Sequence, residues 1–125
     1  MKSYTDLNQS KRLAEILSLK SADMHYARAY FEGKKSDWFI GLGKPIKSDD
    51  IIPCWSLAAL LNVIPYTIYK SDNEFYRLGI DKGYDDYAIW YNNNGFTITD
   101  LDVTSDNFVD ACFAMIEKLH EQKLL

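Results

Sequence analysis

Apolar residues recur every three to four positions near both ends of the chain, which is the spacing of an amphipathic helix. The first predicted helix covers residues 5–20, and Thr5 or Asp6 can accept hydrogen bonds from the free N–H groups at its start. The second is a C-terminal helix over residues 106–122. Its apolar stripe comprises Phe108, Val109, Cys112, Phe113, Ile116 and Leu119.

An apolar segment in the middle of the chain predicts a third helix over residues 53–64. Pro53 suits the first turn of a helix, where its missing N–H costs no hydrogen bond. Pro65 ends the helix, because a proline in the helix interior would break the backbone hydrogen bonding. The residues between the two prolines are apolar on almost every side, so we expect this helix to be central.

Shorter segments alternate between apolar and polar residues, or are apolar throughout, and these predict strands. Residues 24–31 and 38–42 are two short candidates. Residues 74–80, 86–91 and 96–101 predict an antiparallel meander, because turn-forming Asp, Asn and Gly residues separate them. This meander and the C-terminal helix are the clearest predicted elements.

Helices and antiparallel strands that follow one another in blocks indicate an α+β fold. We expect a β-meander of three or more strands packed against helices, in a single domain of residues 1–125. A length of 125 residues with 47% hydrophobic residues is sufficient for one folded core.

The formal net charge of −4 argues against nucleic-acid binding, which depends on a positive field from Lys and Arg. The first residues lack the apolar core of a signal peptide. The longest apolar stretch, residues 51–68, contains two prolines and polar residues, so we expect no membrane span and no membrane partner. The expected compartment is the cytoplasm.

Cys54 is the sharpest candidate for chemistry, because a thiol at the start of the predicted central helix would feel the helix dipole and become more nucleophilic. A thiol enzyme also needs a base, usually histidine. His25 precedes Cys54 in the chain, and His120 falls in the last turn of the C-terminal helix. A buried cysteine that helps Trp55 to pack is the favoured interpretation.

The sequence offers no metal-ligand spacing, because its two histidines and two cysteines are far apart. Asp100, Asp102 and Asp106 alternate like part of a calcium loop, but Ser105 stands where that loop needs glycine. We therefore expect no metal and no other cofactor.

Aromatic residues are frequent in the meander, and 14% of all residues are aromatic. If one sheet face packs on helices, the other carries Ala88 and Trp90, with Phe75 and Arg77 as further candidates. Exposed aromatic residues beside arginine are typical of binding surfaces. The candidate binding residues are Arg77, Tyr87, Trp90 and Tyr91. The alternative is that both faces are covered and these aromatic residues belong to the core.

Two apolar segments carry a resemblance to known sequences. They are Ile52–Leu61, with its Pro-x-Trp-Ser-Leu motif, and Asp110–Leu119, with its Asp-Ala-Cys motif. Residues 50–122 resemble uncharacterised short proteins of Bacteroides-type gut bacteria, their phages and mobile elements. The resemblance implies an intracellular and prophage-borne setting, and it implies no activity.

The first hypothesis is a non-enzymatic protein-interaction or regulatory protein, which acts as a homodimer or as a modulator of another protein. The second is a module that binds a small molecule or a saccharide with Trp90 and nearby tyrosines. The third is a thiol-dependent enzyme that uses Cys54. The missing catalytic constellations favour the first hypothesis.

Overall fold

The computed structural model describes residues 2–125, except for the side chains of residues 96–99. The chain divides into two compact units, Ser3–Ala59 and Leu60–Leu125, and Lys2 belongs with the second. The single domain expected from the sequence stays a prediction. No helix in this described part of the chain is long and apolar enough to cross a membrane.

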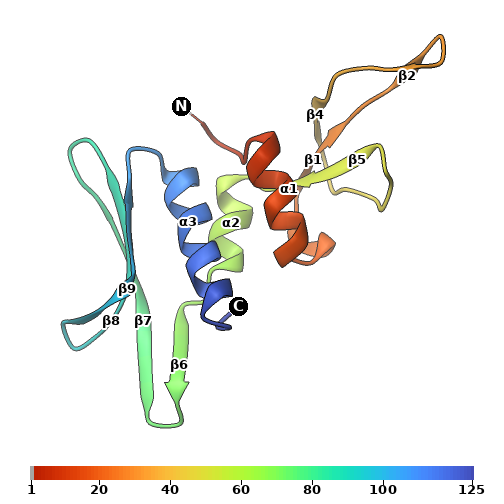
Figure 1. Cartoon of the computed structure of the whole chain (residues 1–125). Coiled ribbons are helices and arrows are strands. Elements are labelled where there is room, and N and C mark those ends of the chain that lie inside the picture. The colour runs from red at the N-terminus through yellow and green to blue at the C-terminus, as the bar shows by residue number, and fades with distance from the viewer. Residues whose placement is uncertain (1) are drawn as a thin grey trace. The chain divides into compact units, whose positions relative to one another are not determined.

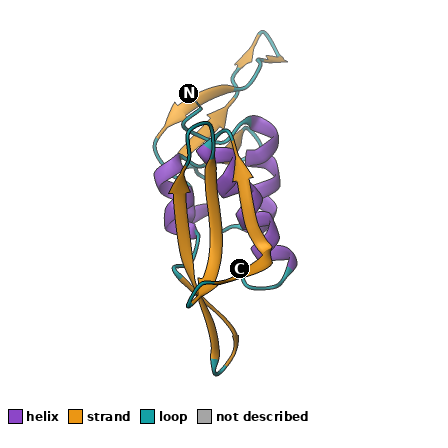
Figure 2. Ribbon diagram, turned by 90° about the vertical axis from the view of Figure 1, so that its left-hand side faces the viewer, coloured by secondary structure: helices purple, strands orange, loops and turns teal. Residues whose placement is uncertain are grey.

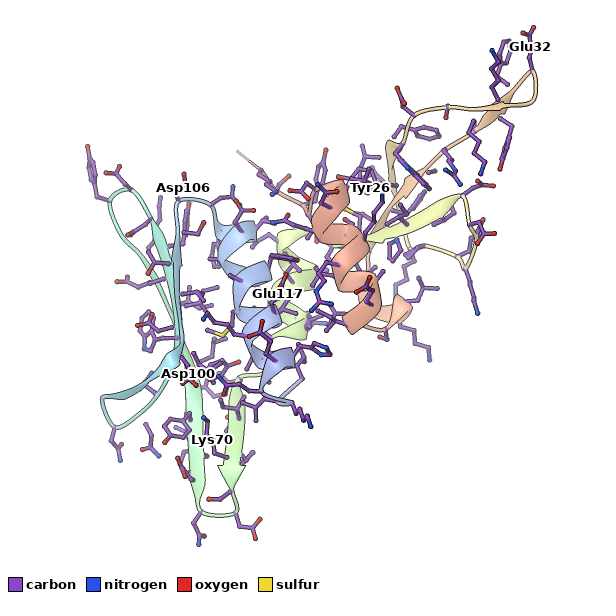
Figure 3. The ribbon with its side chains drawn as sticks, in the orientation of Figure 1. Tyr26, Glu32, Lys70, Asp100, Asp106 and Glu117 are labelled. Carbon is purple, nitrogen blue, oxygen red and sulfur yellow. The ribbon has the colours of Figure 1, made fainter. Side chains whose placement is uncertain are left out.

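The unit Ser3–Ala59 combines one helix with a small antiparallel sheet of order β4-β1-β5 (Figure 1). A two-stranded hairpin, β2–β3, lies between β1 and β4 in the chain, with Glu32 at its tip (Figure 3). Glu32 and Gly33 both have positive φ angles, 49° and 77°, as the tight turn of a two-residue hairpin requires. The elements are α1 (Leu7–Ile16), a 3-10 turn (Leu19–Ser21), β1 (Met24–Ala27), β2 (Tyr30–Phe31), β3 (Lys34–Lys35), β4 (Phe39–Leu42) and β5 (Ile51–Cys54).

The predicted N-terminal helix is present as α1, which is shorter than the predicted residues 5–20 because Leu17 is already extended and Leu19–Ser21 form a 3-10 turn. Asp6 caps it, accepting from the Gln9 amide at 2.8 Å, while the Gln9 side chain accepts from the Asp6 amide at 3.1 Å. Leu13 of α1 and Trp55 are fully buried and belong to the core. The Trp55 indole donates to the Ser21 hydroxyl at 2.9 Å, so its polar atom is satisfied inside the core.

The predicted helix over residues 53–64 is present as α2 (Leu57–Val63), which begins four residues later than expected. Residues 51–54 form strand β5 instead, where Pro53 lies opposite His25 of β1. A proline is tolerated there because β5 is an edge strand, so the position of its missing N–H needs no partner. Ser56 then caps the helix, with its hydroxyl accepting from the Ala59 amide at 3.2 Å.

The unit Leu60–Leu125 contains the predicted meander, extended to four antiparallel strands in the order β6-β7-β8-β9. Helix α3 (Phe108–Glu121) packs on β8 and β9, and Asn107 caps it by accepting from the Asp110 amide at 3.1 Å. The fold is α+β with a C-terminal helix, as the sequence predicts. The strands are β6 (Thr67–Ser71), β7 (Glu74–Lys82), β8 (Tyr87–Asn93) and β9 (Phe96–Ser105).

The four-stranded sheet has one face covered by α3 and one face free of helices, and Figure 2 looks onto the free face. The buried Ile89 lies opposite Ile80 and Val103 and belongs to the covered face. The next residue, Trp90, lies opposite Gly79 and Asp102 and belongs to the free face. The alternation predicted from the sequence is therefore correct for these strands.

Candidate functional site

The four residues selected from the sequence divide between the two faces of this sheet. Tyr91 is fully buried under α3, and its hydroxyl donates to the Pro65 carbonyl. Tyr87 stacks on Phe108 of α3, with ring centroids 4.9 Å apart. These two tyrosines therefore pack on the covered face of the sheet, while Trp90 and Arg77 lie on the free face.

Trp90 lies flat on the free face because its cross-strand neighbour has no side chain. A Cβ atom on Gly79 would come within 2.4 Å of the indole Cε2, which is closer than side chains can approach. Arg77 also lies over an aromatic ring, with its guanidinium carbon 5.5 Å from the Phe75 centroid. The free face thus presents a half-buried tryptophan and an exposed arginine that lies over an aromatic ring.

Beside Arg77 the free face holds a hollow of about 330 Å³. It is lined by Phe75, Arg77 and three consecutive asparagines, Asn92, Asn93 and Asn94. The Asn93 amide donates to the Phe75 carbonyl at 2.8 Å, which ties the β8–β9 turn to β7. An arginine, several amides and one ring are groups that orient a small polar ligand.

Cys54 is fully buried at the end of β5, and burial raises the pKa of its thiol. Its sulfur contacts Thr5, whose hydroxyl lies 3.5 Å away and in turn 2.7 Å from the Ser10 hydroxyl. His25 is paired with Pro53, the neighbour of Cys54, so the imidazole and the thiol belong to opposite faces of the sheet. The arrangement is that of a packed structural thiol.

His25 has its own place on the other face of this sheet. Its Nδ1 donates to the Gly43 carbonyl at 3.0 Å, and its ring covers Gly41, where a Cβ would lie 2.4 Å from Nε2. The ring borders a hollow of about 250 Å³ whose other lining residues are Lys44, Pro45, Ile46 and Ile51. None of these described lining residues is an acid that would complete a catalytic pair with the imidazole.

The feature that sequence reasoning missed is a concentration of exposed apolar side chains in one stretch of the first unit. Leu42 is 85% exposed, Phe31 76% and Ile46 70%. We call the exposed apolar residues of this stretch the apolar surface, although they lie on the β2–β3 hairpin, on both faces of β4 and in the segment after it: Tyr30, Phe31, Phe39, Ile40, Leu42 and Ile46. The available signal was the uncharged run of residues 38–42, whose pattern alone predicts only a strand.

Three of these residues belong to β4, which lies at the edge of its sheet and pairs only with β1. Trp38, just before β4, is held by Arg28, whose guanidinium carbon lies 4.6 Å from the ring centroid. Arg28 is fixed in turn by Asp50, at 3.0 Å from Nε. The residue just before the edge strand is therefore an anchored tryptophan.

Within the described residues, no group of three or more His, Cys, Asp or Glu side chains is arranged to hold a metal ion. No family model, curated protein or solved structure matches this chain. The resemblance of residues 50–122 to short Bacteroides-type proteins stays a prediction.

Proposed function

We propose that this chain is a non-enzymatic protein-interaction protein that binds its partner through the apolar surface. The observation that carries the proposal is the exposure of Leu42, Phe31 and Ile46 within one short stretch of sequence. Single exposed apolar residues are normal on proteins, but several large ones together are typical of interaction sites. The buried thiol and the separated histidine favour binding over catalysis.

Strand β4 adds a second argument for the same surface. Edge strands usually carry lysine, proline or a bulge that prevents pairing with other chains. From Trp38 to Leu42 the chain has no charged residue and no proline. An apolar edge with free backbone groups is suited to receive a strand from a partner.

Photo-cross-linking in the native host tests this proposal. A photoreactive amino acid replaces Leu42 in one variant, and in the matched control it replaces Lys70, an exposed residue of β6 (Figure 3). We expect a discrete adduct from position 42 and none from position 70. The absence of any adduct from positions 42, 31 and 46 would overturn the proposal.

The hollow beside Arg77 supports a second candidate function, the binding of a small polar molecule or a saccharide. Its arginine and asparagines supply hydrogen-bonding groups, and its volume is within the range of ligand pockets. A thermal-shift screen of saccharides and sugar acids tests it. Stabilisation that disappears in Arg77→Gln, but persists in the matched control Lys70→Gln, would support this function. A screen without stabilisation would exclude it for these compounds.

A further inference from the structure

We infer that the partner of β4 is a second copy of the same chain, joined by antiparallel pairing of the two β4 strands about Ile40. The inference rests on the proposed function, because it names the partner of the apolar surface. It joins two three-stranded sheets into one sheet of six strands across a twofold axis.

Symmetry restricts how two identical strands can pair. In an antiparallel pair, directly opposed residues have side chains on the same face of the sheet. When a twofold axis perpendicular to the sheet relates the two strands, each residue lies opposite one whose side chain points to the same face. One residue at the centre then lies opposite its own copy. Ile40 and Gly41 are the two central residues of β4, so each is a candidate for this position.

When the twofold axis passes beside Ile40, the side chains of the two β4 strands fit one another. Ile40 then faces Ile40 of the second copy, Trp38 faces Leu42, and Phe39 faces Gly41. Each large side chain meets a small or aliphatic one, and every exposed apolar residue of β4 gains a cross-strand neighbour. The 85% exposed Leu42 is covered by the tryptophan that Arg28 already holds in place.

Centring on Gly41 is less favourable, because it places Trp38 opposite Lys44 and leaves Phe39 facing Gly43 outside the strand.

The charges that flank β4 favour the antiparallel direction. Asp37 precedes the strand and Lys44 follows it, and residues 38–43 carry no charge. Antiparallel pairing brings the acidic end of one copy to the basic end of the other, whereas parallel pairing would bring like charges together. The pairing is short for a stable dimer, which commonly buries roughly 800 Å² per partner, so we expect reversible association.

The register predicts a disulfide at one position. Opposed Cα atoms in an antiparallel pair are about 4.5–5.5 Å apart, which lies within the range that a disulfide spans. Ile40→Cys should therefore cross-link to its own copy under mild oxidation. The matched control Leu42→Cys should remain uncross-linked, because four residues of strand, about 14 Å, separate the two copies of position 42. Both native cysteines are buried and do not compete.

Analytical ultracentrifugation over a hundredfold range of concentration completes the test. We expect a monomer–dimer equilibrium that Leu42→Lys weakens at least tenfold, while Tyr69→Lys, a matched change in the edge strand β6 outside the apolar surface, leaves it unchanged. Both residues are largely exposed, so neither change should disturb the fold. A strict monomer, or equal cross-linking at positions 40 and 42, would overturn the inference. An adduct with a different protein in the photo-cross-linking experiment would then leave the proposed function standing.

Discussion

The contact between Trp90 and Gly79 predicts a strong coupling between these two positions. In Gly79→Ala the new Cβ would lie 2.4 Å from the indole Cε2 and 2.7 Å from Nε1, so the indole must move off the sheet. Such overpacking costs about 1–3 kcal/mol, whereas alanine in a strand otherwise gains about 0.5–1 kcal/mol over glycine. We expect Gly79→Ala to lower the free energy of unfolding by about 1–2 kcal/mol.

The sign should reverse once the tryptophan is removed. In a Trp90→Ala background the three atoms nearest to the added methyl group are gone, and Gly79→Ala should stabilise the chain by about 0.5 kcal/mol. The four chains of this double-mutant cycle are compared by urea unfolding, followed by far-ultraviolet circular dichroism because one tryptophan is absent from two of them. Equal effects of Gly79→Ala in both backgrounds would refute the packing argument.

Three further predictions concern a helix cap, a partly buried phenol and the thiols. Asn107→Ala removes the acceptor of the Asp110 amide and should cost about 1 kcal/mol in urea unfolding, and an unchanged midpoint would contradict the cap. Burial raises the pKa of Tyr26 from 10.0 to about 12, so the folded state keeps a proton that the unfolded chain loses, and stability falls as the pH rises through that interval. Tyr26→Phe should make this fall shallower, and an identical slope would count against it. Cys54 and Cys112 should react with iodoacetamide far more slowly than in the urea-unfolded chain, and equal rates would contradict their burial.

The meander could be predicted because the alternation of apolar and polar residues along each strand depends only on neighbouring positions in the sequence. Alternation with a period of two places Ile89 and Trp90 on opposite faces, whatever the rest of the chain does. Which face α3 covers depends on packing between distant segments. Tyr87 and Tyr91 were therefore grouped with Trp90, although α3 covers the face that carries them.

The start of α2 was not predictable for a related reason. Pro53 fits the first turn of a helix and also fits an edge strand, so its local preference does not decide between them. Pairing with β1, which is distant in sequence, decides for the strand. This also removes Cys54 from the helix start on which the thiol hypothesis depended.

The apolar surface shows a different limit of sequence reasoning. A short apolar run such as residues 38–42 has the same pattern whether its strand lies inside a sheet or at its edge. Only the strand order β4-β1-β5 shows that this run is at an edge and that its side chains are exposed.

Pro53 has a consequence for the kind of assembly that this sheet allows. The sheet has two edges, and β5 occupies the one opposite β4. Proline interrupts the row of N–H donors along β5, and residues just before α1 already bond to its end, with the Thr5 amide 3.0 Å from the Trp55 carbonyl. A sheet that is open on one side only can add one neighbour and then stops. Pairing through β4 can therefore form a dimer, but the blocked β5 edge prevents further copies from adding to form open-ended fibres.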